Sequence, residues 1–131
     1  MHFTSSPLHQ RTRVSLLELF RWQWNGYSTY HRSRKNLLLH IVFVPLFLTA
    51  NIGLLFAIIA HSWILGFVSI PTMGVAIALQ GHGHRQENIP PEPFTSPLNA
   101  IFRIFLEQWI NFPRFVISGG WSRAMRQSIS G

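Results

Sequence analysis

The sequence predicts an all-α membrane protein, in which a transmembrane helical hairpin is flanked by amphipathic helices at the membrane interface. Two long apolar runs, residues 37–60 and 63–79, contain no Asp, Glu, Lys or Arg. Charged residues make up 11% of the chain, against about 25% in ordinary soluble domains. The basic residues lie before the first run and after the second. We therefore expect residues 1–131 to form a single membrane domain.

The charge balance indicates the orientation of the chain and excludes several kinds of site. There are 11 Lys and Arg residues but only 4 Asp and Glu residues, which gives a formal net charge of +7. Because no basic residue lies between the two apolar runs, the positive-inside rule predicts that both termini are cytoplasmic. This distribution favours anionic lipid head groups over nucleic acid as the partner. The lack of cysteine excludes disulfides, thiolate catalysis and Cys-ligated zinc or iron–sulfur centres.

The N-terminal part should form a leader and then a surface helix. Residues 1–13 have no apolar core of signal-peptide length, so we expect a flexible polar leader. Ser15 followed three residues later by Glu18 is a capping-box pattern, which predicts a helix start. Apolar residues then recur at helical spacing, so an amphipathic helix is expected over residues 16–27. Trp22 and Trp24 would lie in it at interfacial depth.

The two apolar runs are each predicted to cross the membrane. The first, residues 37–60, is long enough to span about 30 Å of hydrocarbon and should bend at Pro45 and Gly53. The second, residues 63–79, is shorter and interrupted by glycine and proline, so it should span with thinning or pack closely on the first. The connection at His61 and Ser62 is very tight. Together the runs predict an antiparallel hairpin.

A further amphipathic helix is expected over residues 97–117. Thr95 or Ser96 can cap it, with Pro97 in its first turn. Arg103 and Glu107 are spaced to pair at i, i+4 on its polar stripe. Such a helix could lie on the membrane surface and roof the cytoplasmic mouth of the hairpin.

Histidines mark the cytoplasmic ends of both membrane helices. His40 lies one turn inside the first apolar run, and His82 and His84 follow the second. An antiparallel hairpin makes these two ends neighbours, and His31 lies just before the first span. His31 and His40 can meet only if the helix breaks between residues 33 and 36, where Asn36 is a plausible N-cap. Four imidazoles are therefore expected to converge at one membrane edge.

Converging imidazoles indicate a metal site, because neutral histidine commonly binds iron, copper or zinc and polar groups inside a membrane are costly. Glu87 adds a carboxylate near His84, as a direct ligand, as a partner that orients a histidine, or as a base. The structural alternative is that His40 hydrogen-bonds to a neighbouring helix and that the GHGH segment forms a surface turn.

Four other residues are candidates for contacts near the metal. Tyr30 could supply a hydroxyl group, although belts of aromatic residues at membrane interfaces have the same appearance. Asn36 and Gln80 could hydrogen-bond to substrate, and Gln80 could equally be a polar residue at a helix end. Arg34 could receive a fatty carboxylate, or serve topology and lipid contacts alone.

Two segments give the chain a resemblance to a known family. The stretch "YHRSRKNLLLHIVFVPLF", with His31, Asn36, His40 and Pro45, resembles the first signature of membrane proteins related to the Mpo-type 2-hydroxy fatty acid dioxygenases. The stretch "QGHGHRQENIPP" resembles the second, a Gly-His element followed by an acidic residue and a proline. In that family the glutamate follows the histidine by four positions. Here Glu87 follows one histidine of the pair by five positions and the other by three, so either could be the counterpart.

The resemblance implies a non-haem Fe(II) site that uses O2 to shorten a 2-hydroxy fatty acid, or a similar lipid, by one carbon. Under it, the implied metal ligands are His31, His40, His82 and His84. Glu87 and Tyr30 would act in catalysis, and Asn36, Gln80 and Arg34 would contact the substrate. Residues 98–112 would form a lid or a substrate wall.

Three rival functions remain open at this point. His40 and His82 could hold a b-type haem for electron transfer. The same ligand types could bind zinc in a hydrolase. A hairpin without enzymatic activity is the third, with structural histidines. In each case a second copy of the chain could cover the apolar faces, which would make a homo-oligomer.

Overall fold

The computed structural model describes residues 15–128, and the predicted leader lies outside them. The described part of the chain is mainly helical and contains no β-strand. Its elements are, in chain order, α1 (Leu16–Asn25), the 3-10 helix η2 (Tyr27–Tyr30), α2 (Arg34–Ile59), α3 (Trp63–His84), α4 (Pro97–Leu106), the π-helix η3 (Glu107–Asn111), α5 (Phe112–Ile117) and α6 (Gly120–Gln127).

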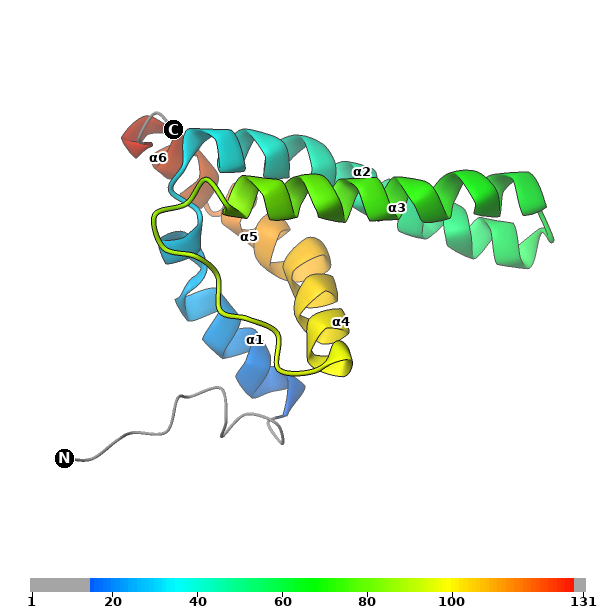
Figure 1. Cartoon of the computed structure of the whole chain (residues 1–131), viewed down its shortest axis with the longest axis horizontal. Helices are drawn as coiled ribbons and strands as arrows, with labels where there is room; N and C mark the ends of the chain where they lie inside the picture. The colour runs from blue at the N-terminus through cyan, green and yellow to red at the C-terminus, as the bar shows by residue number, and fades with distance from the viewer. Residues whose placement is uncertain (1–14, 129–131) are drawn as a thin grey trace.

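The predicted antiparallel hairpin is confirmed by α2 and α3, which lie side by side (Figure 1). Both are long and apolar enough to cross a membrane. The second helix extends beyond the expected residues 63–79, because it continues through Gly81 and Gly83 to His84. The alternative of a GHGH surface turn is therefore wrong. The first helix also begins earlier than expected, and its N-cap is Ser33, whose Oγ accepts from the backbone N of Asn36.

The start of α2 and the end of α3 approach each other very closely at Gly83. A Cβ atom on this residue would lie 2.5 Å from Asn36 Oδ1 and 3.2 Å from Asn36 Cα. The approach is thus possible because glycine has no side chain. It sets the spacing between α2 and α3 where the histidines are.

The flanking helices follow the sequence expectations with small shifts. In α1 the Oγ of Ser15 accepts from the backbone N of Glu18 at 3.3 Å, as the capping pattern predicts, and the helix ends at Asn25. The predicted segment 97–117 is helical throughout, with a π-helical turn between α4 and α5. Its N-cap is Ser96, whose Oγ accepts from the backbone N of Asn99 at 3.0 Å. Both α1 and α4 lie on the same side of the hairpin (Figure 1).

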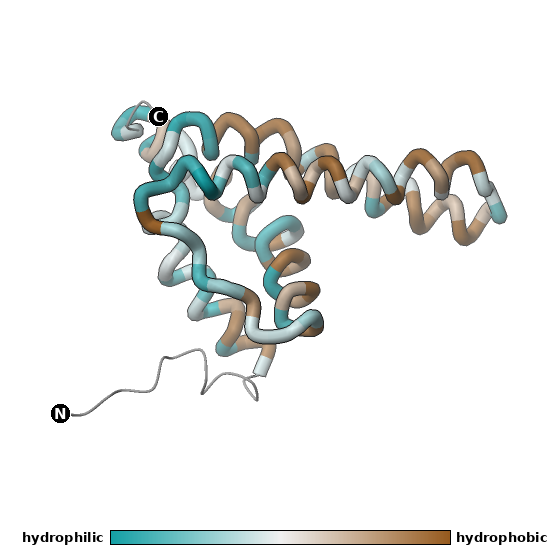
Figure 2. The backbone as a smooth tube through the Cα atoms, viewed as in Figure 1, coloured by the Kyte–Doolittle hydropathy of each residue, from teal (hydrophilic) through white to brown (hydrophobic). Residues whose placement is uncertain are grey.

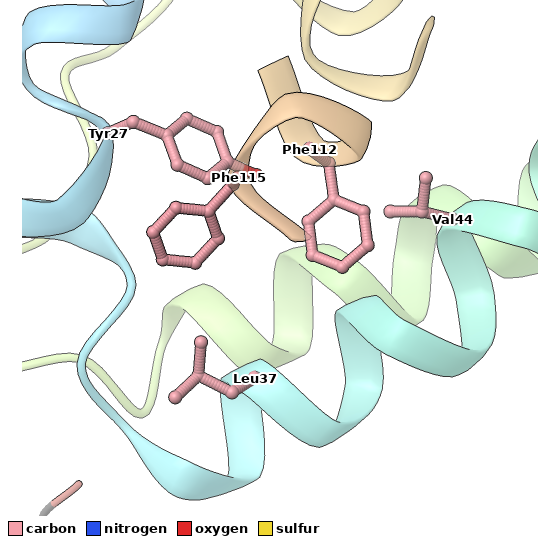
Figure 3. Close-up of a cluster of buried hydrophobic side chains, with 5 residues drawn as sticks. All are labelled: Tyr27, Leu37, Val44, Phe112 and Phe115. Atoms are coloured by element: carbon pink, nitrogen blue, oxygen red, sulfur yellow. The ribbon is translucent and has the colours of Figure 1, made fainter. Parts of the chain in front are cut away.

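A small buried core joins the flanking helices to one end of the hairpin. Its members, shown in Figure 3, are Tyr27, Leu37, Val44, Phe112 and Phe115. Burying each of these large side chains stabilises the fold by about 1.5–3 kcal/mol. The indole Nε1 of Trp121 also donates to the carbonyl oxygen of Leu37 at 3.0 Å, which fixes α6 on the start of α2.

The other end of the hairpin projects beyond all other helices and is strongly hydrophobic (Figure 2). Trp63, Ile64 and Phe67 are 82%, 80% and 75% exposed. Large exposed apolar surfaces of this kind mark sites of contact with a membrane or with another protein. This surface suits a lipid environment for the projecting half.

Substituting Gly83 by Ala should destabilise the protein by about 1–3 kcal/mol, because the added methyl group displaces Asn36 in a packed contact. Gly81 is the matched control on the same helix, since a Cβ there meets no atom within 4 Å. Gly81→Ala should stabilise by about 0.5–1 kcal/mol. Thermal unfolding in detergent, followed by circular dichroism, measures both. Equal effects would contradict the close approach.

Candidate metal centre

Three imidazoles and one carboxylate converge where the hairpin meets the flanking helices. They belong to His31, His40, His84 and Glu107, and one ligand atom from each lies within 4.8 Å of all the others. The three rings are nearly perpendicular in pairs, with centroids 4.8–4.9 Å apart. The structure thus gathers at a single point four side chains of the types that can hold a metal ion.

Each member of the cluster comes from a different segment of the chain. His31 follows η2 and stacks on the ring of Tyr27, with ring centroids 3.9 Å apart. His40 lies near the start of α2, and His84 is the last residue of α3. Glu107 is the first residue of the π-helix η3. π-helical turns frequently occur at functional sites.

Backbone carbonyl groups fix which nitrogen of two rings faces the cluster. The Nδ1 of His31 lies 2.7 Å from the carbonyl oxygen of Tyr27, and the Nδ1 of His40 lies 2.9 Å from that of Asn36. A carbonyl oxygen can only accept, so Nδ1 must carry the proton in each ring. In the neutral rings the Nε2 atoms are then lone-pair donors for a metal.

The electrostatics of the cluster favour a neutral His31 and a charged Glu107. Burial lowers the pKa of His31 to about 4, although the neighbouring carboxylate works against this shift. Burial alone would raise the pKa of Glu107, but the three histidine side chains beside it hold the pKa well below its usual range. The hydroxyl group of Tyr27 donates to Glu107 Oε1 at 3.4 Å, and burial followed by the charge of Glu107 raises the pKa of Tyr27.

A cation at this point would satisfy groups that otherwise face each other as acceptors. Glu107 Oε1 lies 3.4 Å from His31 Nε2, 3.2 Å from His40 Nε2 and 3.9 Å from His84 Nε2. In the carbonyl-bonded tautomer, His31 Nε2 is buried and has no hydrogen-bond partner. A carboxylate oxygen beside unprotonated ring nitrogens is repulsive without a positive charge between them. The donor set therefore fits a divalent transition metal.

Two predicted members lie outside the cluster. His82 is exposed on α3, two residues from the cluster member His84. Residues two apart on a helix point about 200° away from each other, so only one of the pair can face the site. Glu87 also lies elsewhere, since its carboxylate accepts from the backbone N of Arg32 and of Ser33 and from Asn36 Nδ2, at 2.8–3.2 Å. Glu87 thus holds the start of α2, where a negative charge is favourable.

The other predicted contact residues lie in three places, namely the cavity wall, the buried interior and the surface. Tyr30 and Gln80 line the cavity beside the cluster. The amide of Gln80 is committed to Gln108 through two hydrogen bonds of 3.0 and 2.7 Å. Asn36 is fully buried and donates to Tyr30 O and to Glu87. Arg34 is exposed and donates to Ser128 Oγ.

Glu107 is the member that the sequence analysis missed. Its expected partner, Arg103, instead donates to the carbonyl oxygens of Pro93 and Glu92 at 3.1 and 2.9 Å. The sequence did contain a pattern that points to Glu107. It is a carboxylate on the polar stripe of an amphipathic helix that was expected to cover one end of the hairpin. Helical spacing made an i, i+4 ion pair the simpler interpretation.

A cavity of about 650 Å³ adjoins the cluster. It lies between α1, the end of α3, the segment after α3, and α4 with η3, and its walls are mostly apolar. His31, His84 and Glu107 all form part of its lining. The volume lies within the range of pockets that bind small molecules. A ligand in the cavity would therefore contact the cluster directly.

Removing the Glu107 carboxylate should abolish metal binding, whereas the same change at Glu87 should not. Glu107→Gln deletes the charge at the point of convergence. Glu87→Gln should keep the metal but lower stability by about 1.5–3 kcal/mol, because charge-assisted bonds to the start of α2 are lost. Metal content by mass spectrometry after anaerobic purification, together with thermal unfolding, distinguishes the two. Metal loss in Glu87→Gln but not in Glu107→Gln would refute the assignment.

The two histidines at the end of α3 form a second matched pair. His84→Ala should reduce the metal content to a small fraction of the wild-type value, because one of four converging donors is lost. His82→Ala should leave the metal content unchanged, since this ring lies on the exposed face. The opposite pattern would show that α3 is rotated relative to the structure described here.

Comparison with known proteins gives one match. A family model described as 2-hydroxy-palmitic acid dioxygenase Mpo1-like matches residues 17–113, which include all four residues of the cluster. No curated protein matches the chain. No solved structure matches it.

Proposed function

The chain belongs to the Mpo1-like family of 2-hydroxy-palmitic acid dioxygenases, and on this premise we propose that it is an iron(II)-dependent membrane dioxygenase. It would shorten a 2-hydroxy fatty acid, or a similar lipid, by one carbon with O2. The observation that carries the proposal is the buried cluster of three histidines and Glu107 at the wall of a largely apolar cavity. The family match also confirms the resemblance of the two histidine segments.

The ligand set supports a non-haem iron site over a haem site. Many non-haem Fe(II) oxygenases bind the metal through two histidines and one carboxylate, and this cluster adds a third imidazole. A haem held by two histidines needs their rings on opposite faces of the macrocycle. Within the cluster, ring centroids 4.8–4.9 Å apart leave no space for a haem. His82, the other haem ligand expected from the sequence, is exposed and lies outside the cluster. Zinc accepts the same ligand types, so the choice between zinc and iron is made by experiment.

The reaction balances without an external reductant. One 2-hydroxy acid and one O2 contain the atoms of the one-carbon-shorter acid, carbon dioxide and water. The bond between C1 and C2 breaks, C1 and C2 are oxidised by four electrons in total, and O2 takes up the four electrons. Iron(II) bound at the cluster would supply the activation of O2.

The chain's own residues bind and orient the reactants. The apolar cavity wall, which includes Ile77 and Ile104, receives the acyl chain and keeps water away from the cluster. Tyr27 donates to Glu107 and fixes the orientation of the carboxylate. The carbonyl groups of Tyr27 and Asn36 hold the rings of His31 and His40 with Nε2 toward the metal. Tyr30 places its ring in the cavity lining next to His31, within reach of a substrate.

The hairpin would place this centre at the membrane edge. Its projecting, hydrophobic half would insert into the bilayer, so the cluster would lie at the cytoplasmic interface with both termini on the cytoplasmic side (Figure 2). A fatty acid dissolved in the bilayer could then reach the cavity without crossing water.

The test is an assay of the purified, iron-loaded protein with 2-hydroxyhexadecanoic acid under O2. We expect pentadecanoic acid as the product, with none formed under argon or by Glu107→Gln. Metal content and the absorption spectrum are measured on the same samples. Full activity with zinc in place of iron, or a haem Soret band, would overturn the proposal.

A further inference from the structure

The cavity beside the cluster contains two arginines that could bind an anionic head group. They are Arg85, which directly follows His84 at the end of α3, and Arg103 of α4. Both line the same cavity as His31, His84 and Glu107. Their environments differ so strongly that only one is available to a ligand.

Arg103 is fixed in the cavity wall. It is 8% exposed, and its Nη1 and Nη2 donate to the carbonyl oxygens of Pro93 and Glu92. Its guanidinium also lies over the rings of Trp22 and Phe94, 5.1 and 4.6 Å from the centroids. These contacts tie α1, α4 and the preceding segment together. The Arg103 side chain therefore has a structural role and is not free to bind a ligand.

Arg85 is exposed, and its side chain has no hydrogen bond or ion pair within residues 15–128. The chain has four Asp and Glu side chains, and none of them pairs with Arg85 within the described residues. Glu87 is bound at the start of α2, and Glu107 belongs to the cluster. Glu92 lies beside Arg103, and Glu18 lies in the first turn of α1, away from the cavity. Arg85 is therefore not neutralised by an Asp or Glu side chain of the described residues and is available to an anionic ligand.

We propose that Arg85 binds the carboxylate of the substrate and so determines the specificity of the site for free fatty acids over their esters. The inference rests on the proposed function, because the substrate is a 2-hydroxy acid. With its carboxylate on Arg85, the acid has its C2 end beside His84 and its acyl chain along the apolar wall. Arg34, the arginine expected from the sequence to take this role, is absent from the cavity lining.

The test measures binding separately from turnover. Hexadecanoic acid, which lacks the 2-hydroxyl group, and its methyl ester are titrated into the metal-loaded protein in detergent by isothermal titration calorimetry. The variants are Arg85→Gln, Arg85→Lys and the control Arg126→Gln, an exposed arginine in the last turn of α6. We expect Arg85→Gln to weaken binding of the acid about tenfold or more, because a charge-assisted bond is lost. Arg85→Lys should recover part of it.

Binding of the methyl ester should be the same in all variants, and Arg126→Gln should match the wild type for both ligands. With 2-hydroxyhexadecanoic acid, Arg85→Gln should raise KM at unchanged kcat and unchanged iron content. An equal loss for acid and ester, or no loss, would overturn the role of Arg85. Arg85-dependent binding of the acid without any product would instead refute the proposed reaction while the binding role stands.

Discussion

The structure depends on the convergence of three imidazoles and one charged carboxylate at one wall of the cavity. Backbone carbonyl groups orient His31 and His40 so that their lone pairs face Glu107 Oε1. Such an arrangement is favourable when a positive charge lies among the donors and unfavourable without one. The surrounding helices are arranged so that the donors stay close together in spite of this mutual repulsion.

Three local contacts bring the four candidate metal ligands to one place. Gly83 allows α3 to approach Asn36 of α2, which brings the His84 and His40 turns together. The carboxylate of Glu87 joins the end of α3 to the segment that carries His31. The paired amides of Gln80 and Gln108 join α3 to η3, next to Glu107. Each of these is a short polar or steric contact, placed close to the ligand that it positions.

Much of the fold follows from local sequence patterns, and part of the site does not. The long apolar runs, their tight turn and the cap at Ser15 give the helices, and the antiparallel hairpin brings His40 and His84 together. Selecting His84 over His82 requires knowing that α3 continues through two glycines. Identifying Glu107 as a member of the cluster requires knowing how the segment after α3 folds back. Both facts depend on tertiary packing, which overrides local propensity. Glu87 is close to His84 in the sequence, whereas Glu107 is close to it only in the folded structure.

The four donors come from segments that lie far apart along the chain: the end of η2, α2, α3 and η3. An unfolded chain cannot hold them together, so the free energy of binding a cation adds to the free energy of unfolding. The bound metal would thus act as a cross-link that closes long loops of the chain. If the cluster holds a metal, the lifetime of the protein in a cell would depend on the supply of that metal, and a metal-starved cell would lose the protein itself together with its activity.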